Sequence, residues 1–440
     1  MNHPSPPLQR LLDLTADAVQ AVRAGRSLND QLARVPADAR PGVQALSFHV
    51  LRWLGGALEV RSLCAPKTPP PKVDALLVTA LALLWPTDDA PPYADHTLVD
   101  QAVASARHRT PAAAGFINAV LRRFVRERDA LVAQAMHQPV AAYNHPLWWI
   151  ERIKQDWPAH WQTLLRQANR HPPMTLRVNA RRSTAAAWME QLGAQGLAGQ
   201  VLSNPAYGGC AVMLDRPCPV TALPGFSAGD VSVQDAAAQR AAPLLLGGTP
   251  LPEGAHVLDA CAAPGGKTAH LLELRPDLDL LVLDSDPQRL PRVQDTLNRL
   301  HLQSPRIHLV AADARDTPHW WDGRPFDAIL LDAPCTASGI VRRHPDVRWL
   351  RRPDDVQNLV RVQAGLLDAL WPLLAPGGRL LYATCSLFKA EGKAQIDAFM
   401  QRQGAGGVTQ DPAASGHLLP LADNGPAPED GFFYALLHKI

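Results

Sequence analysis

Cysteine, net charge and long apolar runs are all scarce in this chain, and each scarcity excludes a class of protein. The 440 residues include six cysteines in no secreted-framework spacing, so we expect reduced thiols in a cytosol. The formal net charge of +2 permits a polyanionic partner without requiring one. No run approaches about 18 uninterrupted apolar residues, and the first ten residues are polar, so neither a membrane span nor a signal peptide is expected.

Length and composition predict a soluble protein of more than one domain. Single cores usually stop growing near about 250 to 300 residues. The composition is 47% hydrophobic and 19% charged, which is enough apolar material for large cores without stapling. We expect a helical domain over residues 1–140, a small α/β linker or RNA-binding domain over 141–238, and an α/β domain over 239–440.

The first domain is predicted to be all helical. Apolar residues recur at helical spacing between residues 8 and 132, for example in 46–54 and 76–85. One late helix ends in a cluster of arginines, which favours a solvated face and favourable charge at a helix C-terminus. Contact with RNA or a partner is the alternative for this cluster, which comprises Arg122, Arg123, Arg126 and Arg128.

Residues 145–235 predict a small mixed domain. A strand is expected at 175–179, a helix at 184–192 and a second strand at 231–235. Four tryptophans near its start favour core packing over base stacking, because they recur at near-helical spacing. They are Trp148, Trp149, Trp157 and Trp161.

From residue 254 onward, short apolar runs alternate with helical patterns. Such runs are typical of a parallel sheet covered on both faces, whose ligands lie beyond the C-terminal ends of the strands. A glycine-rich and alanine-rich stretch at 404–416 is expected to be a surface loop. The predicted strands are 256–259, 280–284, 307–310, 328–332 and 380–383, and the predicted helices are 267–274, 290–300 and 356–374.

A glycine-rich turn follows the first of these strands. The sequence Ala-Pro-Gly-Gly-Lys-Thr at 263–268 resembles the end of a phosphate-binding loop, but Cys261 stands where that loop requires its first glycine. The glycines still permit close approach of a ligand to the backbone, and the free amides of the next helix can meet a polar group. Asp284 and Asp313 end the next two strands, where a ribose and an adenine amino group are bound in such folds. This set fits either a nicotinamide or an adenosylmethionine enzyme.

Two cysteines at strand ends favour the second of these alternatives. Cys335 follows Asp332-Ala333-Pro334, and Cys385 lies in Thr384-Cys385-Ser386. A lone cysteine at such a place is usually a small buried apolar group, but two in one cleft suit covalent catalysis. Addition of a thiolate to carbon 6 of cytosine, with a carboxyl group at the ring nitrogen, makes carbon 5 able to attack a methyl sulfonium. A nicotinamide enzyme would leave the cysteine pair without a role.

The same motifs resemble the signature of the RNA cytosine-5 methyltransferases. They are DACAAPGGKT at 259–268, DAPC at 332–335 and YATCS at 382–386. GIVRRHPDVRWL at 339–350 is similar to the bacterial Sun/Fmu branch, which acts on small-subunit ribosomal RNA. GFINAVLR at 115–122 resembles the late helix of an N-terminal domain similar to the antitermination factor NusB. The resemblance spans nearly the whole chain and implies a Rossmann-like catalytic domain dependent on S-adenosylmethionine.

The resemblance also implies roles for individual residues. Cys385 is implied as the nucleophile, Cys335 as the residue that aids product release, and Asp332 as a contact to the base. Arginines and a histidine between 342 and 352 are expected to form a basic loop that holds RNA phosphates, with a solvated surface as the alternative. The implied cofactor site comprises Cys261, Ala262, Ala263, Pro264, Gly265, Gly266, Lys267, Asp284, Asp313 and Asp332, and the RNA-binding candidates are Arg342, Arg343, His344 and Arg348.

One departure from the family pattern concerns the segment after Cys385. The family commonly has Pro-Glu-Glu-Asn there, whereas this chain has Lys389-Ala390-Glu391-Gly392-Lys393, so the next helix is expected to lack its usual cap and acidic pair. The expected activity is nevertheless methylation of carbon 5 of a cytidine in small-subunit ribosomal RNA, by a cytoplasmic monomer that needs no metal.

The target nucleotide must leave its stack, which favours RNA outside the fully assembled subunit as the substrate. A transfer RNA methyltransferase is the alternative within the class. A catalytically inactive RNA-binding or assembly protein is the alternative outside it.

Overall fold

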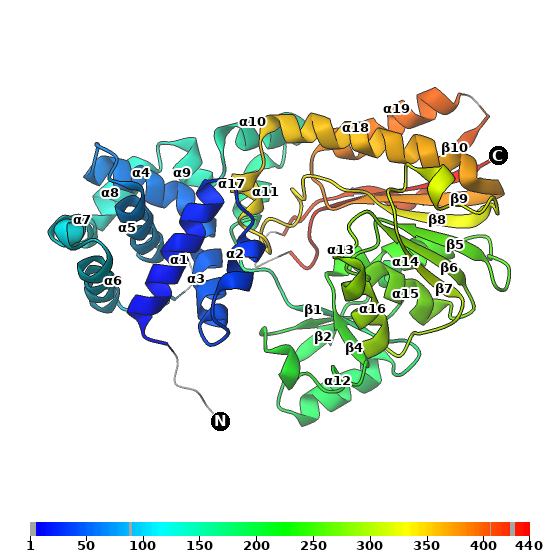
Figure 1. Ribbon diagram of the computed structural model, residues 1–440, viewed down its shortest axis with the longest axis horizontal. Coiled ribbons are helices and arrows are strands. Elements are labelled where there is room, and N and C mark those ends of the chain that lie inside the picture. The colour runs from blue at the N-terminus through cyan, green and yellow to red at the C-terminus, as the bar shows by residue number, and fades with distance from the viewer. Residues whose placement is uncertain (1–5, 88–89, 405, 423–426) are drawn as a thin grey trace. The chain divides into compact units, whose positions relative to one another are not determined.

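A helix that is apolar on all sides lies among the other helices of the N-terminal half of the computed structural model (Figure 1). α5 (Pro71–Leu83) is buried from Val73 to Leu83, as expected for a helix without a polar face. Its one acidic residue, Asp74, is matched by Arg23 at 2.8 Å and by Arg61 at 3.1 Å. The other helices here are α1 (Leu8–Arg23), α2 (Leu28–Arg34), α3 (Arg40–Arg52), α4 (Leu54–Cys64), α6 (Asp95–Arg109), α7 (Ala114–Arg126), α8 (Arg128–Ala135), α9 (Pro139–Tyr143), α10 (Leu147–Asp156) and α11 (Trp161–Gln167).

The structure describes residues 6–87, 90–404, 406–422 and 427–440, and these group into two units. The first unit runs to Arg170 and also contains the distant segment Val341–Pro353, which carries α17 (Val347–Leu350). The second unit contains 171–340 and 354–440. The two units are defined by which segments pack together and not by domain boundaries along the sequence. The three expected domains, with boundaries at 140 and 238, therefore stay a prediction.

The four arginines near the end of α7 and two of the tryptophans have partners within the first unit. Each of the four arginines near the end of α7 has a partner: Asn118 for Arg122, Glu127 for Arg123 and Arg126, and Asp95 for Arg128. Trp149 is buried, and the ring of Trp161 packs against Tyr143 with centroids 5.1 Å apart. The contacts of the tryptophans favour the packing role expected for them. The side chains of Arg123 and Arg126, which are 43% and 68% exposed, favour the solvated helix face expected for the arginines.

A small antiparallel sheet begins the second unit. Its order is β2-β3-β1-β4, with β1 (Thr175–Val178), β2 (Gly199–Val201), β3 (Ala211–Leu214) and β4 (Val231–Val233). α12 (Ala185–Ala194) buries Trp188 and Leu192 in the same apolar cluster as the sheet. The side chain of Thr184 caps this helix by accepting a hydrogen bond from the amide of Ala187.

The second unit also contains a seven-stranded sheet of order β10-β11-β9-β8-β5-β6-β7. The five strands predicted from the sequence are its parallel part, from β9 to β7, and β11 pairs antiparallel with β9 and β10. The strands are β5 (His256–Ala260), β6 (Asp279–Asp284), β7 (Ile307–Ala311), β8 (Phe326–Asp332), β9 (Leu374–Thr384), β10 (Val408–Leu418) and β11 (Phe432–Lys439).

Helices cover both faces of this sheet (Figure 1). Alternate residues of β8 enter different cores, because successive strand side chains point to opposite faces: Leu330 joins one core and Ile329 the other. The first core includes α13 (Ala236–Gln239), α14 (Ala241–Leu246), α15 (Gly266–Leu274) and α16 (Leu290–Arg299). The second includes α18 (Pro353–Leu370) and α19 (Lys393–Gln403).

The prediction of a surface loop at 404–416 is wrong for most of these residues. Its residues 408–416 belong to β10, which pairs with β11, and residue 405 lies outside the described residues. Glycine and alanine have low strand propensity, and a shift of register between Asp411 and Gly416 interrupts the strand. Pairing with β11 therefore stabilises a strand that local sequence does not favour.

Candidate active site

The C-terminal ends of the parallel strands bring most of the expected site residues to one edge of the sheet. Cys261 follows β5, Asp284 ends β6, Asp332 ends β8 and Cys385 follows β9. Because parallel strands end at the same edge, residues more than a hundred positions apart meet there. Asp313 follows β7 at the same edge.

The glycine-rich turn between β5 and α15 has a backbone that depends on its glycines. Gly265 has φ +92°, and a Cβ there would lie 3.0 Å from Cγ1 of Val293. The turn is tied to the next strand, because the amide of Ala263 donates to Asp284 Oδ2 at 3.0 Å. Arg289 donates to the carbonyl oxygen of Ala263 at 2.6 Å, which adds a positioning contact that no sequence signal had indicated.

A pocket between these strand ends has the lining that an adenosine-type cofactor requires. Leu283, Pro334 and Leu366 supply apolar walls for a flat base, and Asp284 and Asp313 supply acceptors for hydroxyl and amino groups. Arg315 also pairs with Asp313 at 2.6 Å and holds the pKa of that carboxyl below its ordinary value. The residues present therefore fit a bound S-adenosylmethionine.

Lys267 and Asp332 form a partly buried ion pair beside the turn. Lys267 Nζ lies 2.6 Å from Asp332 Oδ2. Burial opposes the charge of Lys267, but the negative groups around it, Asp332 first and then Cys385 and Asp259, together outweigh burial, so the pKa of Lys267 is raised. The site thus presents a cation and an anion side by side, and the negative form of Cys385 would favour this cation further.

The two cysteines face each other. Cys335 Sγ and Cys385 Sγ are 3.5 Å apart, at hydrogen-bond distance for thiols. The pKa of Cys335 is raised well above its ordinary value, first by its hydrogen bond to Cys385 and then by burial. Cys335 therefore keeps its proton and can donate it toward the sulfur of Cys385, which is also the less buried of the two.

A second buried carboxyl lies beneath the turn. Asp259 is fully buried at the end of β5 and accepts a hydrogen bond from the hydroxyl of Thr268 at 2.6 Å. Burial raises the pKa of Asp259 to about 7, against the effect of that hydrogen bond. Asp259 was part of the sequence motif, but the motif did not indicate a neutral form near physiological pH.

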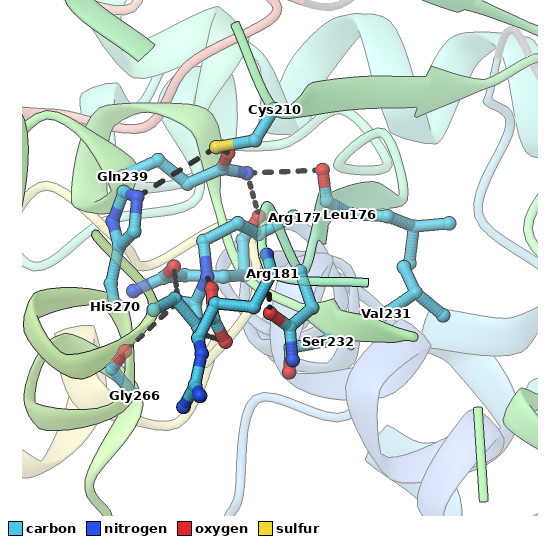
Figure 2. A network of polar contacts seen from close by, with 12 residues as sticks. Leu176, Arg177, Arg181, Cys210, Val231, Ser232, Gln239, Gly266 and His270 are labelled. Carbon is cyan, nitrogen blue, oxygen red and sulfur yellow. Dashed lines mark hydrogen bonds and ion pairs between the residues drawn. The ribbon is translucent and has the colours of Figure 1, made fainter. Parts of the chain in front are cut away.

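An arginine from the small sheet is hydrogen-bonded to Gly266 at the end of the glycine-rich turn (Figure 2). Arg177 on β1 is buried and donates to both carboxylate oxygens of Glu273 on α15, at 2.8 Å each. Its Nη1 also donates to the carbonyl oxygen of Gly266 at 2.9 Å and to the side chain of Gln234. One guanidinium group thus joins the first and last turns of α15, the helix that begins at the glycine-rich turn.

Two of the four expected RNA-binding residues are buried inside the first unit. Arg348 is fully buried, and it donates to the carbonyl oxygens of Asn144 at 3.1 Å and Ala168 at 2.7 Å. Burial and the charge of Arg52 lower the pKa of Arg348 well below its ordinary value. Arg342 is also buried, with 2% of its surface exposed, and its carbonyl oxygen accepts from Arg52.

Their burial argues against the phosphate contacts expected for Arg342 and Arg348, and the guanidinium group of Arg348 is hydrogen-bonded within the fold. Arg343 and His344 are half-buried, and their contact with RNA stays a prediction.

No group of three or more His, Cys, Asp or Glu side chains in the described part of the chain is arranged to hold a metal ion. Among the same residues, no helix has the length and apolar character needed to cross a bilayer.

Known proteins and families are similar to the chain along its whole length. Residues 249–438 match the family described as 16S rRNA methyltransferase RsmB/F, residues 145–221 the RsmF/B-like ferredoxin-like domain, and residues 12–126 the NusB family. Ribosomal RNA small subunit methyltransferase B of Pseudomonas syringae is 42% identical, over 97% of this chain and 96% of the relative. The protein of the same name from Salmonella arizonae is 40% identical over 98% of both chains.

Solved structures share the fold. The crystal structure of PH0851 superposes over 100% of both chains with a TM-score of 0.74 at 24% identity. A methyltransferase homologue from Pyrococcus horikoshii has a TM-score of 0.57 at 25% identity and covers 68% of this chain and 97% of its own.

The fold and the matched domains define a class: a Rossmann-like methyltransferase domain preceded by NusB-like and ferredoxin-like domains. Within that class, the chain belongs to the RsmB/F family of methyltransferases.

Proposed function

We propose that the protein transfers a methyl group from S-adenosylmethionine to carbon 5 of a cytidine in small-subunit ribosomal RNA, through a covalent bond between Cys385 and carbon 6. The observation that carries this proposal is the pair of facing thiols, in which Cys335 keeps its proton while Cys385 lies closer to solvent. The names of the relatives, which are 40 to 42% identical over almost their whole length, support ribosomal RNA as the substrate.

Each residue near the pair has a role in this chemistry. Cys385 Sγ, as thiolate, adds to carbon 6, and Asp332 with Lys267 contacts the polar edge of the ring. The bound cofactor supplies an electrophilic methyl group. After methyl transfer, water takes up the proton of carbon 5, and the electron pair of that bond re-forms the double bond between carbons 5 and 6. The carbon–sulfur bond breaks at the same time and returns its electron pair to Cys385 Sγ. Cys335 aids this release, since its thiol lies 3.5 Å from the departing sulfur.

The proposed substrate is ribosomal RNA that is not yet fully assembled into the subunit, in the cytoplasm. A cytidine within a helix is inaccessible to both sulfur and methyl group, so it must be flipped out or lie in an unpaired region. Unassembled RNA offers such regions.

The test is transfer of labelled methyl from S-adenosylmethionine to unmodified small-subunit ribosomal RNA and, separately, to transfer RNA, with digestion to nucleosides. We expect label in 5-methylcytidine from ribosomal RNA, none with Cys385→Ala, and a covalent RNA–protein complex that accumulates with Cys335→Ala. Cys218→Ala is the matched control, because this cysteine lies outside the site, and it should keep full activity. Label in transfer RNA alone would contradict the substrate, and label that survives Cys385→Ala would contradict the nucleophile.

A further inference from the structure

One buried carboxylate lies at the junction of the two cysteine loops. Glu391 is fully buried, in a 3-10 turn (Lys389–Glu391) before α19. Its Oε1 accepts a hydrogen bond from the backbone amide of Thr336 at 2.8 Å, and its Oε2 accepts one from the hydroxyl of Ser386 at 2.6 Å. Thr336 directly follows Cys335 and Ser386 directly follows Cys385, so one side chain is bonded to both loops.

Further contacts fix Glu391 itself. The hydroxyl of Thr336 also donates to Oε2, and Gln363 Nε2 donates to Oε1 at 3.3 Å. The carbonyl oxygen of Glu391 accepts hydrogen bonds from the hydroxyls of Tyr382 at 2.9 Å and Thr384 at 3.3 Å, both at the end of β9. Its backbone is therefore bonded to the strand that leads into Cys385, and its side chain to the loop that carries Cys335.

The charge of this group is compatible with its contacts. Burial raises the pKa of Glu391, while the hydrogen bonds from Ser386 and Thr336 act to lower it. Both carboxylate oxygens receive donors, so the group meets the requirement that a buried polar group be hydrogen-bonded. Glu391 does not face the cofactor pocket between β5, β6 and β7.

The surrounding segment is also where this chain departs from its family pattern. Gly392 belongs to the segment that departs from the family pattern, and a Cβ there would lie 2.5 Å from Cε1 of His417. The ring of His417 occupies that space and packs against Phe433, with centroids 4.6 Å apart. The expected loss of the acidic pair is thus only partial, because Glu391 is kept and fully bonded.

We propose that Glu391 is a positioning residue that sets the separation of the Cys335 and Cys385 thiols for the proposed reaction. The effect on catalysis rests on the proposed function. The separation of the two thiols can be tested without RNA or cofactor, because it determines the rate at which they form a disulfide. Glu391 touches no reacting atom and acts through Thr336 and Ser386.

The first experiment measures how fast the two thiols join. Diamide oxidises two thiols to a disulfide and takes up both protons and both electrons, and the rate depends on how often the two sulfurs meet. Wild type should form the Cys335–Cys385 disulfide readily, as detected by mass spectrometry of peptides. Glu391→Met has similar length but accepts no hydrogen bond, and it should slow this reaction at least about tenfold. Glu391→Gln keeps one acceptor oxygen and should recover most of the wild-type rate.

The second experiment separates positioning from general damage. Glu391→Met should lower kcat about 100-fold, as misplacement of reacting groups by about 1 Å does, with the KM for S-adenosylmethionine unchanged. Thr336→Val and Ser386→Ala each remove one hydroxyl and should give intermediate losses, which keeps the proposal testable if Glu391→Met does not fold.

The outcomes are distinguishable from those of the proposed function. Slow disulfide formation in Glu391→Met supports the inference even where wild type shows no methylation of cytidine. An unchanged disulfide rate in Glu391→Met overturns it, whatever the RNA product, and so does a loss of cofactor binding equal to the loss of kcat.

Discussion

Arg177 provides the sharpest test of how the small sheet supports the glycine-rich turn and α15. The side chain of Glu273 is 1% exposed, and Arg177 is its only ion-pair partner among the described residues. Arg177→Met removes that partner and leaves the carboxylate of Glu273 buried. Breaking a buried pair in this way typically costs about 3 to 5 kcal/mol, because an uncompensated charge stays buried. Urea unfolding of wild type and variant measures this cost.

The double variant Arg177→Met with Glu273→Met gives the matched comparison. It removes both charges and keeps side chains of similar volume, so the remaining loss is the hydrogen bonding to Gly266 and Gln234, about 1 kcal/mol for each bond. We expect the double variant to be more stable than Arg177→Met alone. Equal destabilisation of both variants would refute the idea that the unpaired charge of Glu273 dominates.

Three other substitutions test separate parts of the structure. Burial raises the pKa of Asp259 to about 7, so its contribution to the free energy of unfolding falls as pH rises from about 4 to 7. In Asp259→Asn, the free energy of unfolding measured in urea should therefore depend less on pH over that range. Gly392→Ala would place Cβ 2.8 Å from Cγ of Phe433 and even closer to His417, and should cost about 1 to 3 kcal/mol, whereas Gly115→Ala, with open space around it, should not destabilise. Arg348→Met should lower the unfolding midpoint of the first unit, because it removes buried hydrogen bonds. The slope of the logarithm of RNA affinity against the logarithm of salt concentration should stay as in wild type, and a smaller slope would show that this guanidinium contacts phosphate.

The parallel sheet was predictable because its signal is local. Runs such as residues 328–331 are apolar on both faces, and their exposed fraction in the structure is 0%. β10 was not predictable in the same way, since its glycines and alanines favour no strand and only its pairing with β11 defines it.

The candidate site likewise contains residues that local sequence predicts and residues that only the fold brings together. The turn at 261–267 and the two cysteines lie in contiguous motifs that follow predicted strands, so their meeting at one sheet edge could be expected. Glu273 is instead 96 residues from Arg177, and Thr336 is 55 residues from Glu391, so no local pattern joins either pair. Arg348 was assigned to RNA because sequence shows charge but not burial, and backbone carbonyls 180 and 204 residues away accept its hydrogen bonds.

The inclusion of Val341–Pro353 in the first unit has a consequence for biosynthesis. The carbonyl groups of Ala168 and Asn144 are synthesised long before the arginine that bonds to them. At about 5 to 20 residues per second, the wait between residues 170 and 341 is roughly ten to thirty seconds. Residues up to 170 of the first unit are therefore synthesised before Arg348 exists. The hydrogen bonds from Arg348 to the carbonyl oxygens of Asn144 and Ala168 can form only after much of the methyltransferase domain has been translated.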